Sequence, residues 1–428
     1  MSQQSAPFRV KLIRTAGGER LPVLLVRATG LPDFDATLWV VSSLRNKNLA
    51  SETIAQALRS LVVLYLALQS CKVNLSERLA AGNFLSPAEI EEISKACRLT
   101  VLANAKALDD QVEGEDQKIS KVTSLEKFRM HQTERAKGDD VDAGTASIRL
   151  GYIREFLTWR ANKAIARAGN EVKANLIALR DIVDNELQNK TPVVTERATV
   201  GQRMGIDRQA QERLLSVVVP TNPQNPWTGE FIRLRNQFIV NAFLALGLRR
   251  GELLGIRVGD FNPQAHELLI LRRPDDMSDP RLQEPNAKTR DRVLPVSYDL
   301  YALMKRYLML RHELVAGRNE FLIVANTGDP MSKSEANRIF DVLSQKFPPK
   351  VSPHILRHTF FENLADDLHR ARKDDVEILN ILTRLGGWSD NSNSPRRYTK
   401  RFAQERAAEA GLALQAKLYI RNPPERTP

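Results

Sequence analysis

Helical periodicity of apolar residues dominates the pattern of hydrophobic and polar positions along the chain. From Ser51 to about Leu68, apolar residues recur every three or four positions, which predicts a helix with one buried face. Ser86, followed three residues later by Glu89, predicts a capping box that begins another helix, to about Leu99. Similar patterns predict helices over 146–167, 170–188 and 230–246, more helices through about 218, and a last alanine-rich helix over about 403–418.

Strand patterns are short and few. Residues 8–28 predict two strands around the turn Gly17-Gly18. Three further strands of a small sheet are predicted over 267–273, 292–297 and 321–326. The charged stretch 107–143 predicts a solvated helix and a loop. The expected fold class is therefore mainly α with a small antiparallel sheet (α+β).

The clearest boundary is the segment 219–227, which holds three prolines in seven positions. Proline lacks a backbone donor and disfavours helix in the residue before it, so we expect this segment to act as a linker. It divides the chain into a β-hairpin or arm-like segment at 1–45, a helical region at 46–219 and a C-terminal domain at 220–428.

Composition narrows the class of protein. The chain has 428 residues, 42% of them hydrophobic and 27% charged, which supports a real core and excludes wholesale disorder. Two cysteines, Cys71 and Cys97, are too few for a disulfide scaffold or a four-thiolate zinc site, and they suit a reducing cytoplasm. The N-terminal residues lack the apolar segment of a signal peptide, and the sequence has no run of about 18 apolar residues, so neither secretion nor membrane spanning is expected. The net charge of +12 fits a polyanion partner without deciding function.

Three short motifs contain residues suited to phosphate chemistry. The first places Arg249 and Arg250 directly after Gly247-Leu248, at a predicted junction of two helices. A buried arginine at this junction needs a partner, and Glu252 lies three residues from Arg249. From these residues alone, Arg249 could form a structural ion pair with Glu252 or could be a functional arginine.

The second motif begins with Ser352-Pro353, a favourable helix start with serine as the N-cap. His354 and Arg357 then share one face of the first turn, where the helix dipole favours an anion. His354 and His358 have the spacing of a zinc pair, but Ile355 stands where a zinc protease needs its glutamate. No metal site is therefore expected.

The third motif is Leu385-Gly386-Gly387-Trp388, with Tyr398 ten residues after the tryptophan among basic residues. Taken alone, Tyr398 is either a surface aromatic beside solvated charges or a nucleophile whose phenol is activated by neighbouring cations.

In this order and spacing, the motifs resemble those of the tyrosine recombinases (phage integrase family), over residues of about 225–405. The resemblance makes Arg249 the first catalytic arginine, His354 and Arg357 the H-x-x-R pair, and Tyr398 the nucleophile. Trp388 takes the family's His/Trp position, although Gly387 intervenes where the family usually has none.

The resemblance also implies a catalytic lysine. Lys288, which directly follows the long loop 274–287, matches it. It implies a helical DNA-binding N-terminal region, double-stranded DNA as substrate, and assembly as a dimer or tetramer on DNA, with no cofactor, metal or membrane. The implied activity is site-specific recombination through a 3′-phosphotyrosine intermediate, in the integration, excision or transposition of a mobile element. A type IB topoisomerase-like relaxase and an inactive DNA-binding protein of this fold are the alternatives.

Overall fold

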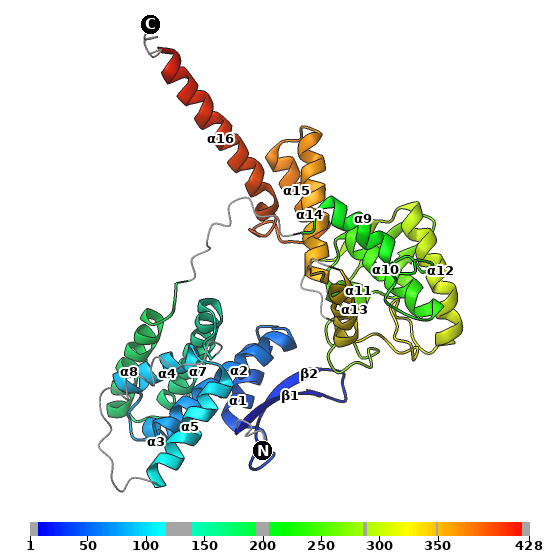
Figure 1. Ribbon diagram of the computed structural model, residues 1–428. Coiled ribbons are helices and arrows are strands. Elements are labelled where there is room, and N and C mark those ends of the chain that lie inside the picture. Colours follow the sequence, from blue (N-terminus) through cyan, green and yellow to red (C-terminus); the bar gives the residue numbers. More distant parts are fainter. Residues whose placement is uncertain (1–6, 117–138, 194–204, 286–288, 348–349, 422–428) are drawn as a thin grey trace. The chain divides into compact units, whose positions relative to one another are not determined.

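The computed structural model describes residues 7–116, 139–193, 205–285, 289–347 and 350–421. The chain forms two compact units, Met1–Arg197 and Ala198–Pro428, which are described separately (Figure 1).

The N-terminal unit begins with the predicted hairpin. Strand β1 (Phe8–Arg14) pairs antiparallel with β2 (Arg20–Val26), in a register that runs from Phe8 opposite Val26 to Arg14 opposite Arg20. Gly18 in the turn has a φ of +85°, a conformation that glycine adopts without strain.

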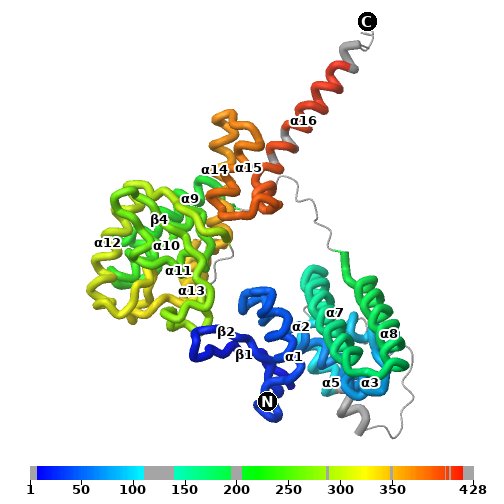
Figure 2. The backbone as a smooth tube through the Cα atoms, turned by 180° about the vertical axis from the view of Figure 1, so that it is seen from behind, coloured from blue at the N-terminus to red at the C-terminus, as the bar shows by residue number. Residues whose placement is uncertain are grey.

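The rest of this unit is helical. Its helices are α1 (Phe34–Trp39), the π-helical η1 (Val40–Arg45), α2 (Ser51–Ser70), α3 (Leu75–Ala80), α4 (Pro87–Cys97), α5 (Val101–Asp116), α7 (Ala143–Ile165) and α8 (Asn170–Asn189). The capping box predicted at Ser86 and Glu89 is confirmed at the start of α4. Helices α7 and α8 lie side by side (Figures 1 and 2). Among the described helices, α2 is long and apolar enough to cross a membrane, but most of it is buried in the core of this unit.

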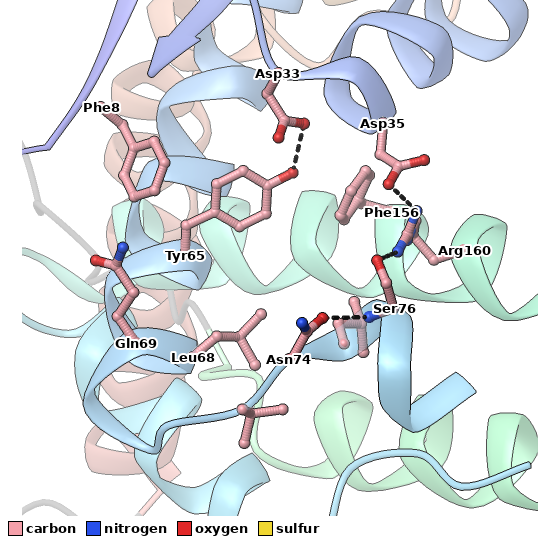
Figure 3. A pocket seen from close by; sticks show the side chains of 12 residues that line it. Phe8, Asp33, Asp35, Tyr65, Leu68, Gln69, Asn74, Ser76, Phe156 and Arg160 are labelled. Carbon is pink, nitrogen blue, oxygen red and sulfur yellow. Dashed lines mark hydrogen bonds and ion pairs between the residues drawn. The ribbon is translucent and has the colours of Figure 1, made fainter. Parts of the chain in front are cut away.

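Polar pairs join α1, α2 and α7 around a cavity of about 370 Å³, which Phe8 of the hairpin also lines (Figure 3). The Tyr65 hydroxyl donates to Asp33 at 2.9 Å, while Arg160 pairs with Asp35. Leu24 of the hairpin and Trp39 of α1 are fully buried in the same core as α2. The segment predicted as a separate arm at 1–45 thus shares one core with the helices that follow it.

The C-terminal unit combines helices with a small sheet. Its helices are α9 (Arg208–Val217), α10 (Glu230–Leu246), α11 (Arg250–Gly255), the 3-10 turn η2 (Val258–Asp260), α12 (Tyr298–Val315), α13 (Lys333–Lys346), α14 (Pro353–Arg370), α15 (Asp375–Gly386) and α16 (Arg396–Arg421). The sheet has the order β3 (Phe261–Asn262), β4 (Glu267–Ile270), β5 (Arg292–Pro295), and both of its pairings are antiparallel. Helices α14 and α15 pack together and against the start of α16 (Figure 2).

The strand predicted at 321–326 is not part of this sheet. Its backbone makes isolated bridges, from Phe321 to Arg257 and from Val324 to Pro330. The Tyr307 hydroxyl donates to the Leu322 carbonyl at 3.0 Å and accepts from the Val324 N–H at 3.3 Å. The apolar run is a buried core segment whose backbone groups pair with a side chain, which periodicity alone does not distinguish from a strand.

The proline-rich segment at 219–227 is packed within the C-terminal unit. Asn225 donates to the carbonyls of Val218 and Val219, each at 3.1 Å, and accepts from the Trp227 N–H. Helix α9, which precedes the segment, buries Leu214 in the core of the same unit. The two units therefore divide at 197/198, which is N-terminal to the predicted boundary at 219/220.

Candidate active site

Two glycine-capped helix ends place backbone carbonyls around the two arginines predicted for the site. Gly247 ends α10 and Gly387 ends α15, both in the left-handed conformation. Arg357 on α14 donates to the Gly247 carbonyl at 2.6 Å and to the Gly386 carbonyl at 3.0 Å. Arg249 also donates to the Gly386 carbonyl, at 3.2 Å. Residues more than 100 positions apart in the chain thus converge on one junction.

Glu252 organises the charges at this junction from a fully buried position. Its carboxylate accepts from the Arg249 backbone N–H at 2.9 Å, from Arg292 Nη2 at 2.8 Å and from the Thr289 hydroxyl. Arg357 Nη1 lies 3.9 Å from the same carboxylate. The Arg–Glu pair considered from the sequence is therefore present, as one contact in a larger network.

The pKa values of these groups reflect burial and mutual contact. Burial opposes ionisation of Glu252, but Arg292 and then Arg357 outweigh it and lower the pKa of Glu252 to about 2. Burial, with Arg249 nearby, lowers the pKa of Arg357 to about 9, so Arg357 keeps its charge at neutral pH. The three arginines face one carboxylate, and the surplus positive charge suits a phosphate diester.

A hydrogen-bonded chain of three side chains reaches Tyr398. The Tyr398 hydroxyl lies 2.9 Å from His358 Nδ1, and His358 Nε2 lies 2.9 Å from His354 Nε2. Ser352 caps the helix that carries both histidines, as predicted, by accepting from the Ile355 N–H at 3.2 Å. Tyr398 and His358 are buried, whereas His354 is exposed.

Trp388 contacts both arginines and the tyrosine. The guanidinium carbon of Arg357 lies 4.8 Å from its ring centroid, and that of Arg249 lies 5.8 Å away. The ring centroids of Trp388 and Tyr398 are 6.0 Å apart. The additional glycine Gly387 ends α15 with a φ of +63°, and the Trp388 N–H bonds to the Thr383 carbonyl at 3.1 Å. Gly387, which the family usually lacks before its His/Trp position, therefore forms the C-terminal cap of α15.

The structure brings together five of the six residues predicted for the site: Arg249, His354, Arg357, Trp388 and Tyr398. Lys288 lies outside the described residues. The Arg290 N–H, two residues further on, donates to the Gly387 carbonyl at 3.1 Å. This bond connects the residues that follow loop 274–287 to the site.

Sequence reasoning missed Arg292, and it gave His358 no catalytic role in the site. Arg292 begins a predicted strand, and nothing local distinguishes it from a surface arginine. His358 could have been found from its i, i+4 spacing to His354, which places both rings on one face of a helix.

The described fold is mainly α with a small antiparallel sheet, the fold class predicted from the sequence. Residues 222–405 match the model of the phage integrase family.

Curated relatives include the tyrosine recombinase XerA of Thermococcus kodakarensis, which is 26% identical over 283 residues, 60% of this chain and 86% of that protein. Tyrosine recombinase XerD of Proteus mirabilis is 25% identical over 194 residues, 44% of this chain and 52% of that protein. Solved structures with similarity include a XerA recombinase (17% identity, TM-score 0.33, covering 87% of this chain and 99% of that chain). A XerH site-specific recombinase bound to its difH substrate has 16% identity and a TM-score of 0.37, covering 83% and 95%.

We expect Gly247→Ala to destabilise the C-terminal unit by more than about 2 kcal/mol. The left-handed backbone costs an L-residue about 1–2 kcal/mol. A Cβ atom at this position would also lie 2.2 Å from Phe360 Cδ1. Urea unfolding checks the change, with Gly411→Ala as the control because a Cβ there meets nothing within 4 Å. Equal stability of the two variants would contradict this account of the turn.

Proposed function

We propose that this protein is a site-specific DNA recombinase that cleaves and rejoins DNA strands through a 3′-phosphotyrosine intermediate. The observation that carries the proposal is that the Trp388 ring contacts the ring of the buried Tyr398 and also lies under the guanidiniums of two arginines, Arg249 and Arg357. The match of residues 222–405 to the phage integrase family supports the same reaction.

In the proposed cleavage step, the Tyr398 oxygen attacks the phosphorus atom and displaces the 5′ oxygen. Negative charge builds on the non-bridging oxygens, and Arg249 and Arg357 stabilise it with forked guanidiniums. Lys288 protonates the departing 5′ oxygen, and His354 assists proton transfer. Trp388 orients the phosphate or the nucleophile. The phosphotyrosine retains the bond energy, so the reverse reaction rejoins a strand without a cofactor.

The partners follow from the same proposal. The substrate is double-stranded DNA at recombination sites, which the helical N-terminal unit and the C-terminal unit bind together. The net charge of +12 makes binding weaken as salt rises. Assembly as a dimer or tetramer on DNA, a cytoplasmic location, and integration, excision or transposition of a mobile element complete the proposed role.

Covalent capture tests the reaction on a mixture of DNA sequences. The protein is incubated with DNA duplexes that carry a randomised central region, denatured in detergent, and the DNA that stays attached is sequenced. We expect a defined sequence joined through its 3′ phosphate, with a free 5′ hydroxyl on the other end. A wild-type protein that captures no DNA contradicts the proposal.

The recovered sequence then separates recombination from relaxation. Two copies are placed on one supercoiled plasmid. Recombinant products support a recombinase, whereas relaxation of a plasmid with a single copy, without recombinants, supports the topoisomerase-like alternative. Binding without a covalent adduct would indicate an inactive DNA-binding protein.

We expect Arg249→Ala to slow cleavage by about 10²–10³-fold, the usual effect of removing one preorganised donor to a transition-state oxyanion. Because its side chain is 30% exposed, Arg249 can be removed with less disturbance of the fold than Arg357. The rate of adduct formation on the recovered sequence measures the effect. Arg370→Ala is the control, since Arg370 is an exposed arginine on α14 that pairs only at the surface with Asp367. Equal rates would remove Arg249 from the mechanism.

A further inference from the structure

His358 occupies the position between the nucleophile and the exposed histidine of the site. Its Nδ1 atom lies 2.9 Å from the Tyr398 hydroxyl, and its Nε2 atom lies 2.9 Å from His354 Nε2. We infer that, in the recombinase reaction proposed above, His358 accepts the phenol proton of Tyr398 and passes its other proton to His354. His358 is thereby a catalytic residue, because it contacts the reacting oxygen.

The two contacts restrict the tautomers. A neutral imidazole carries one N–H and one acceptor nitrogen. If Nδ1 of His358 accepts from the phenol, its proton lies on Nε2 and is donated to His354 Nε2. The other neutral tautomer, with the proton on Nδ1, has Nε2 accepting from His354. Both tautomers use the same heavy-atom positions, so proton transfer along the chain needs no movement of the rings.

The proton transfers balance. As the Tyr398 oxygen bonds to phosphorus, its O–H bond breaks and an N–H bond forms at His358 Nδ1. At the same time the N–H bond at His358 Nε2 breaks and one forms at His354 Nε2. His358 stays neutral throughout, and the positive charge appears on His354. Rejoining runs the transfers in reverse and returns the proton to Tyr398.

The surroundings of His358 favour passing the proton on to His354 over keeping it on His358 as an imidazolium. His358 is buried, and burial, His354, Arg397 and Arg357 lower its pKa to about 4, so an imidazolium is unstable there. His354 is exposed to solvent, although burial of part of its ring and Arg397 lower its pKa as well. The charge is therefore better placed on His354, the solvent-exposed end of the three hydrogen-bonded side chains.

Tyr398 needs such an acceptor. Burial raises the pKa of its phenol to about 12, although Arg357 and Arg397 act in the opposite direction. At pH 7 only about one molecule in 10⁵ would carry a phenolate without help. Glu362 disfavours the phenolate and Arg249 favours it, which completes the charged groups around the hydroxyl.

Two substitutions separate proton transfer from packing. His358→Ala removes the ring, while His358→Asn retains a hydrogen-bond acceptor near the position of Nδ1 but has no basic nitrogen. Cleavage is measured on the duplex recovered with the wild-type protein, in its ordinary form and with sulfur in place of the departing 5′ oxygen. Since a thiolate leaves without a proton, the sulfur form bypasses the acid and isolates the nucleophile's side of the reaction.

We expect both variants to cleave about 10²–10⁴-fold more slowly on both duplexes, the usual contribution of general acid–base catalysis. Their rates should rise about tenfold per pH unit, because hydroxide must then remove the phenol proton, while the wild type changes little near neutrality. Added imidazole should restore cleavage by His358→Ala, which has room for it, but not by His358→Asn. His312→Ala, which removes an exposed histidine from α12, should behave as the wild type.

Other outcomes overturn the inference. A rate within threefold of the wild type in His358→Asn, or recovery of either variant on the sulfur duplex, would remove His358 from the nucleophile's side. A slow variant with a wild-type pH profile and no response to imidazole would limit His358 to packing. These results require a wild-type adduct, so they are distinct from a failure of the proposed function, in which the wild type itself captures no DNA.

Discussion

Replacing Tyr398 by phenylalanine should abolish the covalent adduct with DNA while leaving DNA binding within a few-fold of the wild type. The substitution removes the only atom that can form the phosphotyrosine bond at this position, and it keeps the ring in contact with Phe361 and Trp388. The lost hydrogen bond to His358 should reduce stability by about 1 kcal/mol, too little to unfold the unit. Detergent-resistant adducts measure cleavage, and gel mobility measures binding.

Tyr298→Phe is the matched control for this prediction. Tyr298 begins α12 with 74% of its surface exposed, and its phenylalanine variant should cleave as the wild type does. A persistent adduct in Tyr398→Phe would assign the nucleophile to another residue. Peptide mapping of the wild-type adduct identifies the attached residue directly.

The second large effect concerns stability. Glu252→Gln should lower the free energy of unfolding of the C-terminal unit by about 3–5 kcal/mol, the usual result of removing one partner from a buried ion pair. The carboxylate faces Arg249, Arg292 and Arg357, and its removal leaves buried guanidiniums without compensation. Urea unfolding followed by hydrogen exchange in peptides from α11 and α14 measures this unit separately. Glu313→Gln, an exposed site on α12, is the control.

The pH dependence of stability provides an independent check on Glu252. The folded pKa of about 2 lies below the ordinary value of 4.5, so this carboxylate stabilises the fold above pH 4.5 and loses that contribution as pH falls toward 2. The contribution is about 3 kcal/mol, because one pKa unit corresponds to about 1.4 kcal/mol. Glu252→Gln should lack this loss, and the two proteins should converge in stability on acidification. A constant difference between them across this range would contradict the ion-pair network.

Much of the fold could be read from local patterns. The hairpin at 8–28, the capping box at Ser86 and the helix start at Ser352 were predicted because each depends on residues within a few positions of one another. The segment at 321–326 was misjudged because a short apolar run fits a strand and a buried core segment equally well. The proline-rich segment has the composition of a linker, and only the contacts of Asn225 and Trp227 reveal its packing.

For the site, the sequence by itself determined the identities and order of the groups proposed to react: Arg249, His354, Arg357, Trp388 and Tyr398. Local chemistry limits which side chains can hold a phosphate or attack it, so their types and spacing carry that information. Tertiary structure alone decided that Glu252 joins Arg292 to the other arginines, and that His358 connects Tyr398 to His354. Glu252 and Arg292, like His358 and Tyr398, are 40 residues apart, and burial supplies the low dielectric that makes their contacts strong. No local pattern encodes contacts at that separation.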